Sequence, residues 1–143
     1  MTLEEKREYL KKYRIKTLKI ENIKQDRETL RALAEQSTQP IGVQRGSGGP
    51  NDRVGRIATC LVDAEKELIK EEEECKETRR RIKALIDSVA DETSREILAL
   101  RFLRGWTVRQ VAEKMNYDDR HIRRKTKQAI LRMNFDSVHK DTL

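Results

Sequence analysis

TVRQVAEKMNYDDRHIRRKTKQAILR, residues 107–132, is the stretch that decides the fold, because its pattern predicts two short helices joined by a tight turn. Thr107 is a suitable N-cap for the first helix, which is predicted over 108–115. Asn116 is expected in the turn, since asparagine is one of the few non-glycine residues that readily adopt a positive φ. The second helix is predicted over about 119–133, so the stretch has the layout of a helix-turn-helix.

A dense apolar block at 97–103 stands immediately before this stretch and predicts one more helix, over 94–103. Gly105 is expected to end that helix in the left-handed conformation, which glycine adopts without strain. The resulting domain should span 91–134. Its three helices would share a core of seven side chains: Ile97, Leu98, Phe102, Val111, Met115, Ile122 and Ala129.

The second helix of the motif has two different faces when its residues are placed at 100° per residue. Four side chains cluster within about 60° and can pack on the preceding helix: Ile122, Thr126, Ala129 and Met133. Four others cluster within about 100° on a different side and face outward: Arg120, Arg123, Arg124 and Lys127. Segment 94–134 holds eleven basic against four acidic residues, a surplus equal to the +7 net charge of the whole chain. This local surplus indicates a polyanionic partner.

Double-stranded DNA fits this arrangement best, with the second helix in the major groove. Arginine can donate two hydrogen bonds to guanine O6 and N7, or to a phosphate. Base contacts come mostly from the first half of such a helix, which selects five candidates: Asp119, Arg120, His121, Arg123 and Arg124. Three residues are better placed for the phosphate backbone: Thr107, Arg109 and Lys127. The alternative is a solvated basic face that has no partner.

Two long helical patterns precede this domain. Residues 1–36 predict one helix, 37–52 (STQPIGVQRGSGGPND) a flexible linker, and 53–90 a second helix. The second helix has a heptad seam, interrupted in its middle by Glu71 and Thr78. Six seam residues are candidates for an oligomer interface: Val54, Ile57, Leu61, Leu68, Ile82 and Leu85. The seam fits an antiparallel hairpin within one chain or a contact between chains, and its apolar character favours a dimer or higher oligomer.

The pattern places the chain in the all-α class, as a long helical hairpin or coiled coil followed by a three-helix helix-turn-helix domain. Residues 135–143 show no period and are expected to form a tail. No nucleophile–base pair, carboxylate dyad or Cys/His ligand spacing occurs, so we expect no enzyme, cofactor, metal site or small-molecule substrate. Cys60 and Cys75 are expected to be free thiols. Neither a membrane-spanning run nor a signal peptide is recognisable, which predicts a cytoplasmic protein.

The sequence ILALRFLRGWTVRQVAEKMNYDDRHIRRKTKQAI, residues 97–130, resembles region 4 of bacterial sigma factors. The similarity lies in the L-x-L-R-F block, the glycine, the threonine cap, the V-A-x-x-M segment, the turn and the R-x-I-R segment. The whole layout, with a charged helical N-terminal half, a Gly/Ser-rich linker and this unit, resembles the ArpU/RinA-like transcriptional regulators of Gram-positive phages and prophages. That resemblance implies activation of late phage genes inside a bacterial host.

Three functions are compatible with these features. The first is a sequence-specific, homodimeric transcriptional regulator that binds double-stranded DNA, with RNA polymerase as a further candidate partner. The second is a phage DNA-packaging component of the small-terminase type, which also combines a helix-turn-helix with helical oligomerisation. The third is a coiled-coil adaptor whose basic end binds an acidic protein. We expect the first; a ring of eight or more subunits would favour the second, and DNA binding that is insensitive to salt would favour the third.

Overall fold

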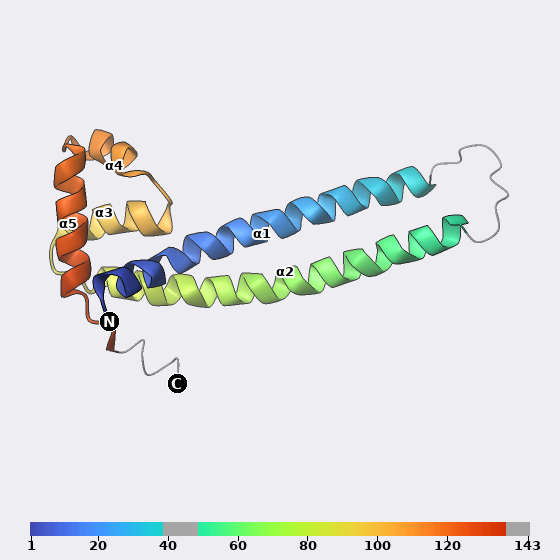
Figure 1. Cartoon of the computed structure of the whole chain (residues 1–143), viewed down its shortest axis with the longest axis horizontal. Helices are drawn as coiled ribbons and strands as arrows, with labels where there is room; N and C mark the ends of the chain where they lie inside the picture. The colour runs from blue at the N-terminus through green and yellow to red at the C-terminus, as the bar shows by residue number, and fades with distance from the viewer. Residues whose placement is uncertain (39–48, 137–143) are drawn as a thin grey trace. The chain divides into compact units, whose positions relative to one another are not determined.

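The computed structural model describes residues 1–38 and 49–136, and these ranges are helical apart from short connections and contain no strand (Figure 1). The predicted all-α class is therefore confirmed. The elements in chain order are α1 (Leu3–Thr38), α2 (Gly49–Asp87), α3 (Glu92–Leu98), the π-helix η1 (Ala99–Leu103), α4 (Val108–Met115) and α5 (Asp119–Arg132). None of the helices in the described ranges is long and apolar enough to cross a membrane.

The chain divides into two compact units, each of which contains a part of α1 and a part of α2. Residues 17–74 form one of them, here called the hairpin unit. Residues 1–16 and the chain from Cys75 onward form the other, here called the head unit. The head unit contains α3, η1, α4 and α5, and therefore the helix-turn-helix.

In the hairpin unit, α1 and α2 run antiparallel. Lys19 Nζ lies 2.8 Å from Glu71 Oε1, and Arg27 Nη1 lies 3.2 Å from Glu65 Oε1, so the residue number falls on α2 as it rises on α1. Four apolar side chains of the two helices are buried: Ile20, Ile23, Ile57 and Leu68. The Glu71 side chain is only 8% exposed, and its pairing with Lys19 holds one register between the helices.

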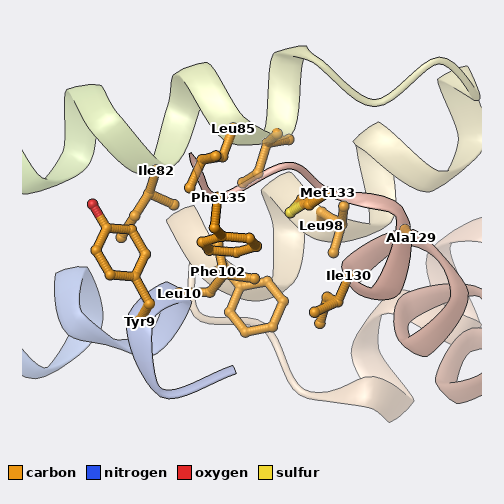
Figure 2. Close-up of a cluster of buried hydrophobic side chains, with 11 residues drawn as sticks. Tyr9, Leu10, Ile82, Leu85, Leu98, Phe102, Ala129, Ile130, Met133 and Phe135 are labelled. Carbon is orange, nitrogen blue, oxygen red and sulfur yellow. The ribbon is translucent and has the colours of Figure 1, made fainter. Parts of the chain in front are cut away.

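In the head unit, a hydrophobic cluster joins the start of α1 and the end of α2 to the helix-turn-helix (Figure 2). We call it the anchor cluster. Its buried members are Tyr9, Leu10, Ile82, Leu85, Ile86, Leu98, Phe102, Ala129, Ile130, Met133 and Phe135. A second cluster lies within the helix-turn-helix itself: Ile97, Leu100, Val111, Ala112 and Ile122 are buried, and Trp106, Val108 and Met115 pack against them.

The segment α3–η1 supplies side chains to both clusters. Leu98 and Phe102, four residues apart, belong to the anchor cluster, whereas Ile97 and Leu100, three residues apart, belong to the second cluster. These pairs lie on different helical faces. The seven residues predicted for the core of the domain all lie in the hydrophobic clusters, but they are divided between the two, because an apolar block this dense covers more than one face.

The seam residues of α2 are buried or half-buried within the chain itself. Of the six residues predicted to form an oligomer interface, Ile57, Leu68, Ile82 and Leu85 are buried in the isolated chain. Val54 and Leu61 are half-buried. The antiparallel hairpin, one of the two arrangements that the seam fits, is therefore present within the chain, and the contact of these residues with a second chain stays a prediction. The heptad pattern itself does not distinguish the two arrangements.

Several boundaries differ from the predicted ones. Residues 37–38 end α1 and residues 49–52 begin α2, so both ends of the predicted linker are helical. The rest of that linker, 39–48, lies outside the described residues. The helix predicted over 53–90 ends at Asp87. The predicted tail begins with Phe135, which is 3% exposed and packed in the anchor cluster, while 137–143 lie outside the described residues.

Candidate nucleic-acid interface

Capping interactions fix both helices of the motif. Thr107 Oγ1 accepts a hydrogen bond from the Gln110 backbone N–H (3.2 Å), and Gln110 Oε1 accepts one from the Thr107 backbone N–H (2.8 Å). This capping box starts α4 at the predicted position. Asn116 ends α4 at φ 59° and ψ 40°, the left-handed conformation predicted for it. Asp118 caps α5, since its Oδ1 accepts from the His121 backbone N–H at 2.7 Å.

Helix α5 separates buried from exposed side chains as its periodicity predicts. Its buried face consists of Ile122, Thr126, Ala129 and Ile130. Ala112 of α4 is 3% exposed and packs in the same cluster as Ile122, which lets the two helices cross closely. Four basic residues of α5 are exposed and are here called the basic stripe: Arg120, Arg123, Arg124 and Lys127. The stripe is therefore presented by a helix whose other side is fixed in both clusters.

His121 lies at the start of this helix and is held by two neighbours. Its ring centroid is 4.5 Å from that of Tyr117, and its Nδ1 is 2.8 Å from Arg124 Nη2. A guanidinium group can only donate, so Nδ1 is the acceptor and the neutral ring carries its proton on Nε2. His121, a candidate for a base contact, is therefore half-buried and in this tautomer presents one N–H donor.

The other predicted contact residues occupy different surroundings. Thr107 and Arg109 are exposed at the start of α4, and Arg109 Nε lies 3.5 Å from Glu113 Oε1. The Thr107 oxygen accepts a hydrogen bond in the capping box, which leaves its hydroxyl proton able to donate. Asp119 is half-buried in the first turn of α5, where its charge complements the helix dipole.

Asp91 ties the first helix of the domain to α5. Its Oδ2 accepts from the Ser94 hydroxyl (2.6 Å), the Ser94 backbone N–H (3.1 Å) and Lys125 Nζ (3.3 Å). The bonds from Ser94, followed by the bond and charge of Lys125, hold the pKa of Asp91 below its ordinary value. Lys125 is thereby engaged within the domain, so it lies outside the basic stripe.

The sequence reasoning missed basic residues of α1 that lie against the helix-turn-helix. Arg7 and Lys11 line a cavity of about 210 Å³ together with Arg101 of η1 and Arg123 of α5. Arg14 lies against Gly105, in the connection between η1 and α4. Positions 7, 11 and 14 fall on one helical face, and this basic spacing is a signal that could have identified them.

The described residues contain no group of three or more His, Cys, Asp or Glu side chains that could hold a metal ion. Among known families, the model of Sigma-70, region 4 matches residues 91–134. This segment is therefore a helix-turn-helix of the sigma region 4 type, which is a DNA-binding domain. The match covers this segment only. Comparison with curated proteins gave no match, and comparison with solved structures gave none either.

Proposed function

We propose that this protein is a sequence-specific transcriptional regulator that places α5 in the major groove of double-stranded DNA. The observation that carries the proposal is the exposed basic stripe on the second helix of a sigma region 4-like motif. In this motif, the first half of the second helix contacts base edges. No nucleophile, acid–base pair or cofactor site is needed for this activity, so the proposal is a binding protein and not an enzyme.

The proposed contacts are of two kinds: contacts to bases, which determine sequence specificity, and contacts to phosphates, which position the domain on the duplex. Arg120, Arg123 and Arg124 project from the first half of α5 and can each donate twice to guanine. His121 can donate through Nε2–H, and Asp119 can accept from the amino group of cytosine. Three exposed residues can bind phosphates and fix the orientation of the domain: Thr107, Arg109 and Lys127.

The regulatory role is the finer part of the proposal. The layout resembles that of the ArpU/RinA-like regulators, which supports activation of late phage or prophage genes in a bacterial cell and RNA polymerase as a further partner. One helix of this length covers only a few base pairs, so we propose that two copies bind a site of two half-sites. The six seam residues remain the candidates for the contact between the two copies, in place of or in addition to their packing against α1.

The test begins with selection of a bound duplex from a random library, followed by equilibrium binding of the selected and a random duplex at several salt concentrations. The logarithm of the binding constant should fall steeply and linearly with the logarithm of salt concentration, because phosphate contacts release counterions. Arg123→Ala and Arg124→Ala should each weaken binding to the selected site by about 1–3 kcal/mol and relax its sequence preference.

Arg132→Ala is the matched control, because Arg132 is exposed at the far end of α5 and belongs outside the basic stripe. It should leave sequence preference unchanged. Equal losses on both duplexes would reassign Arg123 and Arg124 to phosphate contacts. Binding that does not respond to salt would overturn the DNA-binding proposal, and a ring of eight or more subunits in light scattering would replace the regulator with a packaging component.

A further inference from the structure

The cavity between α1, η1 and α5 is unusual in its charge. Its volume is about 210 Å³, and four cationic side chains line it: Arg7, Lys11, Arg101 and Arg123. Phe102 and Val108 contribute apolar walls, and none of the described acidic residues lines the cavity. All of these lining residues belong to the head unit. Four positive charges around a small cavity repel one another, so the arrangement is most stable when an anion lies between them.

Contacts within the chain leave most of this charge uncompensated. Within the described ranges, neither Arg7 nor Arg123 forms an ion pair. Lys11 Nζ lies 3.8 Å from Glu8 Oε1, but both side chains are more than half exposed, so water screens the pair. Arg101 donates from Nη1 to the Trp106 carbonyl oxygen at 3.0 Å.

Arg101 also has a donor with no acceptor. Its Nε is buried and makes no hydrogen bond to any of the residues that the structure describes. Burial, with the neighbouring charges of Arg123 and Arg7, lowers the pKa of Arg101. A buried donor without a partner is costly unless a ligand supplies the acceptor. An oxyanion has acceptor oxygens on several sides and suits a group of guanidinium donors.

We propose that this cavity binds one phosphate of the DNA backbone, so that Arg7 and Lys11 of α1 form part of the DNA interface. This inference rests on the proposed function. A backbone phosphate is favoured over a free anion because Arg123 of the cavity lies on the face of α5 that carries the basic stripe, so Arg7, Lys11 and Arg101 can bind the phosphate while Arg123 reaches a base. A phosphate held here fixes the orientation of α5 in the groove without specifying a base.

The test compares salt dependence of DNA binding in the full-length protein. Arg7→Gln and Lys11→Gln should each reduce the slope of log binding constant against log salt by up to about 1, and the double variant by about 1 in total, because both residues bind the same phosphate. Both reductions should be the same on the selected and on the random duplex. Arg79→Gln removes the same charge from an exposed position of α2 outside the cavity and should leave the slope unchanged.

Lys11 is exposed, so Lys11→Gln should keep the helical circular dichroism of the parent protein and give a valid result even if Arg7→Gln unfolds. Steep salt dependence in the parent protein with unchanged slopes in both variants would overturn this inference and leave the proposed function standing. A parent protein that does not bind duplex DNA would overturn both.

A second experiment measures Tm with inorganic phosphate and no DNA. Stabilisation that Lys11→Gln abolishes, together with unchanged DNA slopes, would assign the cavity to a free anion and overturn the DNA assignment.

Discussion

Gly105 and Asn116 are the residues with positive φ in the described ranges, at 74° and 59°, and they bracket α4 on either side. Asparagine tolerates this conformation, so Asn116 needs no glycine. Gly105 has a second constraint, because the guanidinium of Arg14 occupies the space that a Cβ would need. This glycine therefore serves both the backbone turn and the approach of α1 to the helix-turn-helix.

Gly105→Ala should lower the free energy of unfolding by about 1–2 kcal/mol, because alanine is strained at a left-handed φ and its methyl group would displace Arg14. The measurement is urea denaturation followed by circular dichroism. Gly55→Ala is the control, since Gly55 lies inside α2 and a methyl group there would meet open space among the described residues. It should raise stability by about 0.5–1 kcal/mol through helix propensity. Equal effects at the two glycines would refute the role given to φ at Gly105.

At the scale of elements, features that depend on local interactions were easier to predict from the sequence than features that depend on tertiary packing. The N-cap at Thr107, the left-handed Asn116 and the glycine after η1 all depend on interactions within four residues, so they could be predicted from the sequence. The π-helix was not predicted. Its wide turn appears in the bond from the Arg104 backbone N–H to the Ala99 carbonyl oxygen, five residues back, at 3.1 Å. Whether this segment forms a π-helix depends on its packing, because α3–η1 supplies side chains to both hydrophobic clusters.

The same distinction applies to the candidate site: its part on α5 could be predicted from the sequence, and its part on α1 could not. The periodicity of α5 correctly separated its exposed basic residues from Ile122 and Ala129, because both sets lie on one helix. The basic spacing at 7, 11 and 14 marks one face of α1, but Arg7 and Lys11 meet the cavity through residues about a hundred positions away, so the local pattern does not tell what that face contacts. The heptad seam had a related ambiguity, since the same spacing serves a partner helix in the same chain or in another.

The pairing of α1 and α2 can be tested by a substitution at Glu71. It occupies a seam position, its side chain is 8% exposed, and its partner Lys19 is 54% exposed. Burying a leucine side chain contributes about 1.5–3 kcal/mol, whereas an ion pair with an exposed partner contributes less. Glu71→Leu should therefore raise the free energy of unfolding by about 1 kcal/mol, measured in urea. Glu73→Leu, at an exposed position of the same helix, should change it by less than about 0.5 kcal/mol. A loss of stability in Glu71→Leu would show that the Glu71 carboxylate stabilises the folded chain in addition to setting the register between α1 and α2.

The helix-turn-helix is joined to the beginning and the end of the described chain. Lys6 of α1 donates from Nζ to the carbonyl oxygens of Met133 (3.3 Å) and Leu131 (3.4 Å), at the C-terminal end of α5. Phe135 packs edge-on against Tyr9, with ring centroids 5.7 Å apart and an interplanar angle of 89°. At the scale of the whole chain, α1 therefore does more than pair with α2: it fixes the C-terminal end of the helix that carries the basic stripe.

Phe135→Ala tests this connection. Phe135 is 3% exposed, and replacing a buried phenylalanine by alanine costs about 3–5 kcal/mol through lost burial and the cavity left behind. We expect a loss near the lower end of that range in urea denaturation, because the segment after α5 can partly collapse into the space. Leu131→Ala removes a comparable side chain that is 52% exposed and should change stability by less than about 0.5 kcal/mol. If the two variants were equally stable, Phe135 would contribute nothing to the anchor cluster, and the helix-turn-helix would be held to α1 by the remaining members of the cluster and the hydrogen bonds of Lys6.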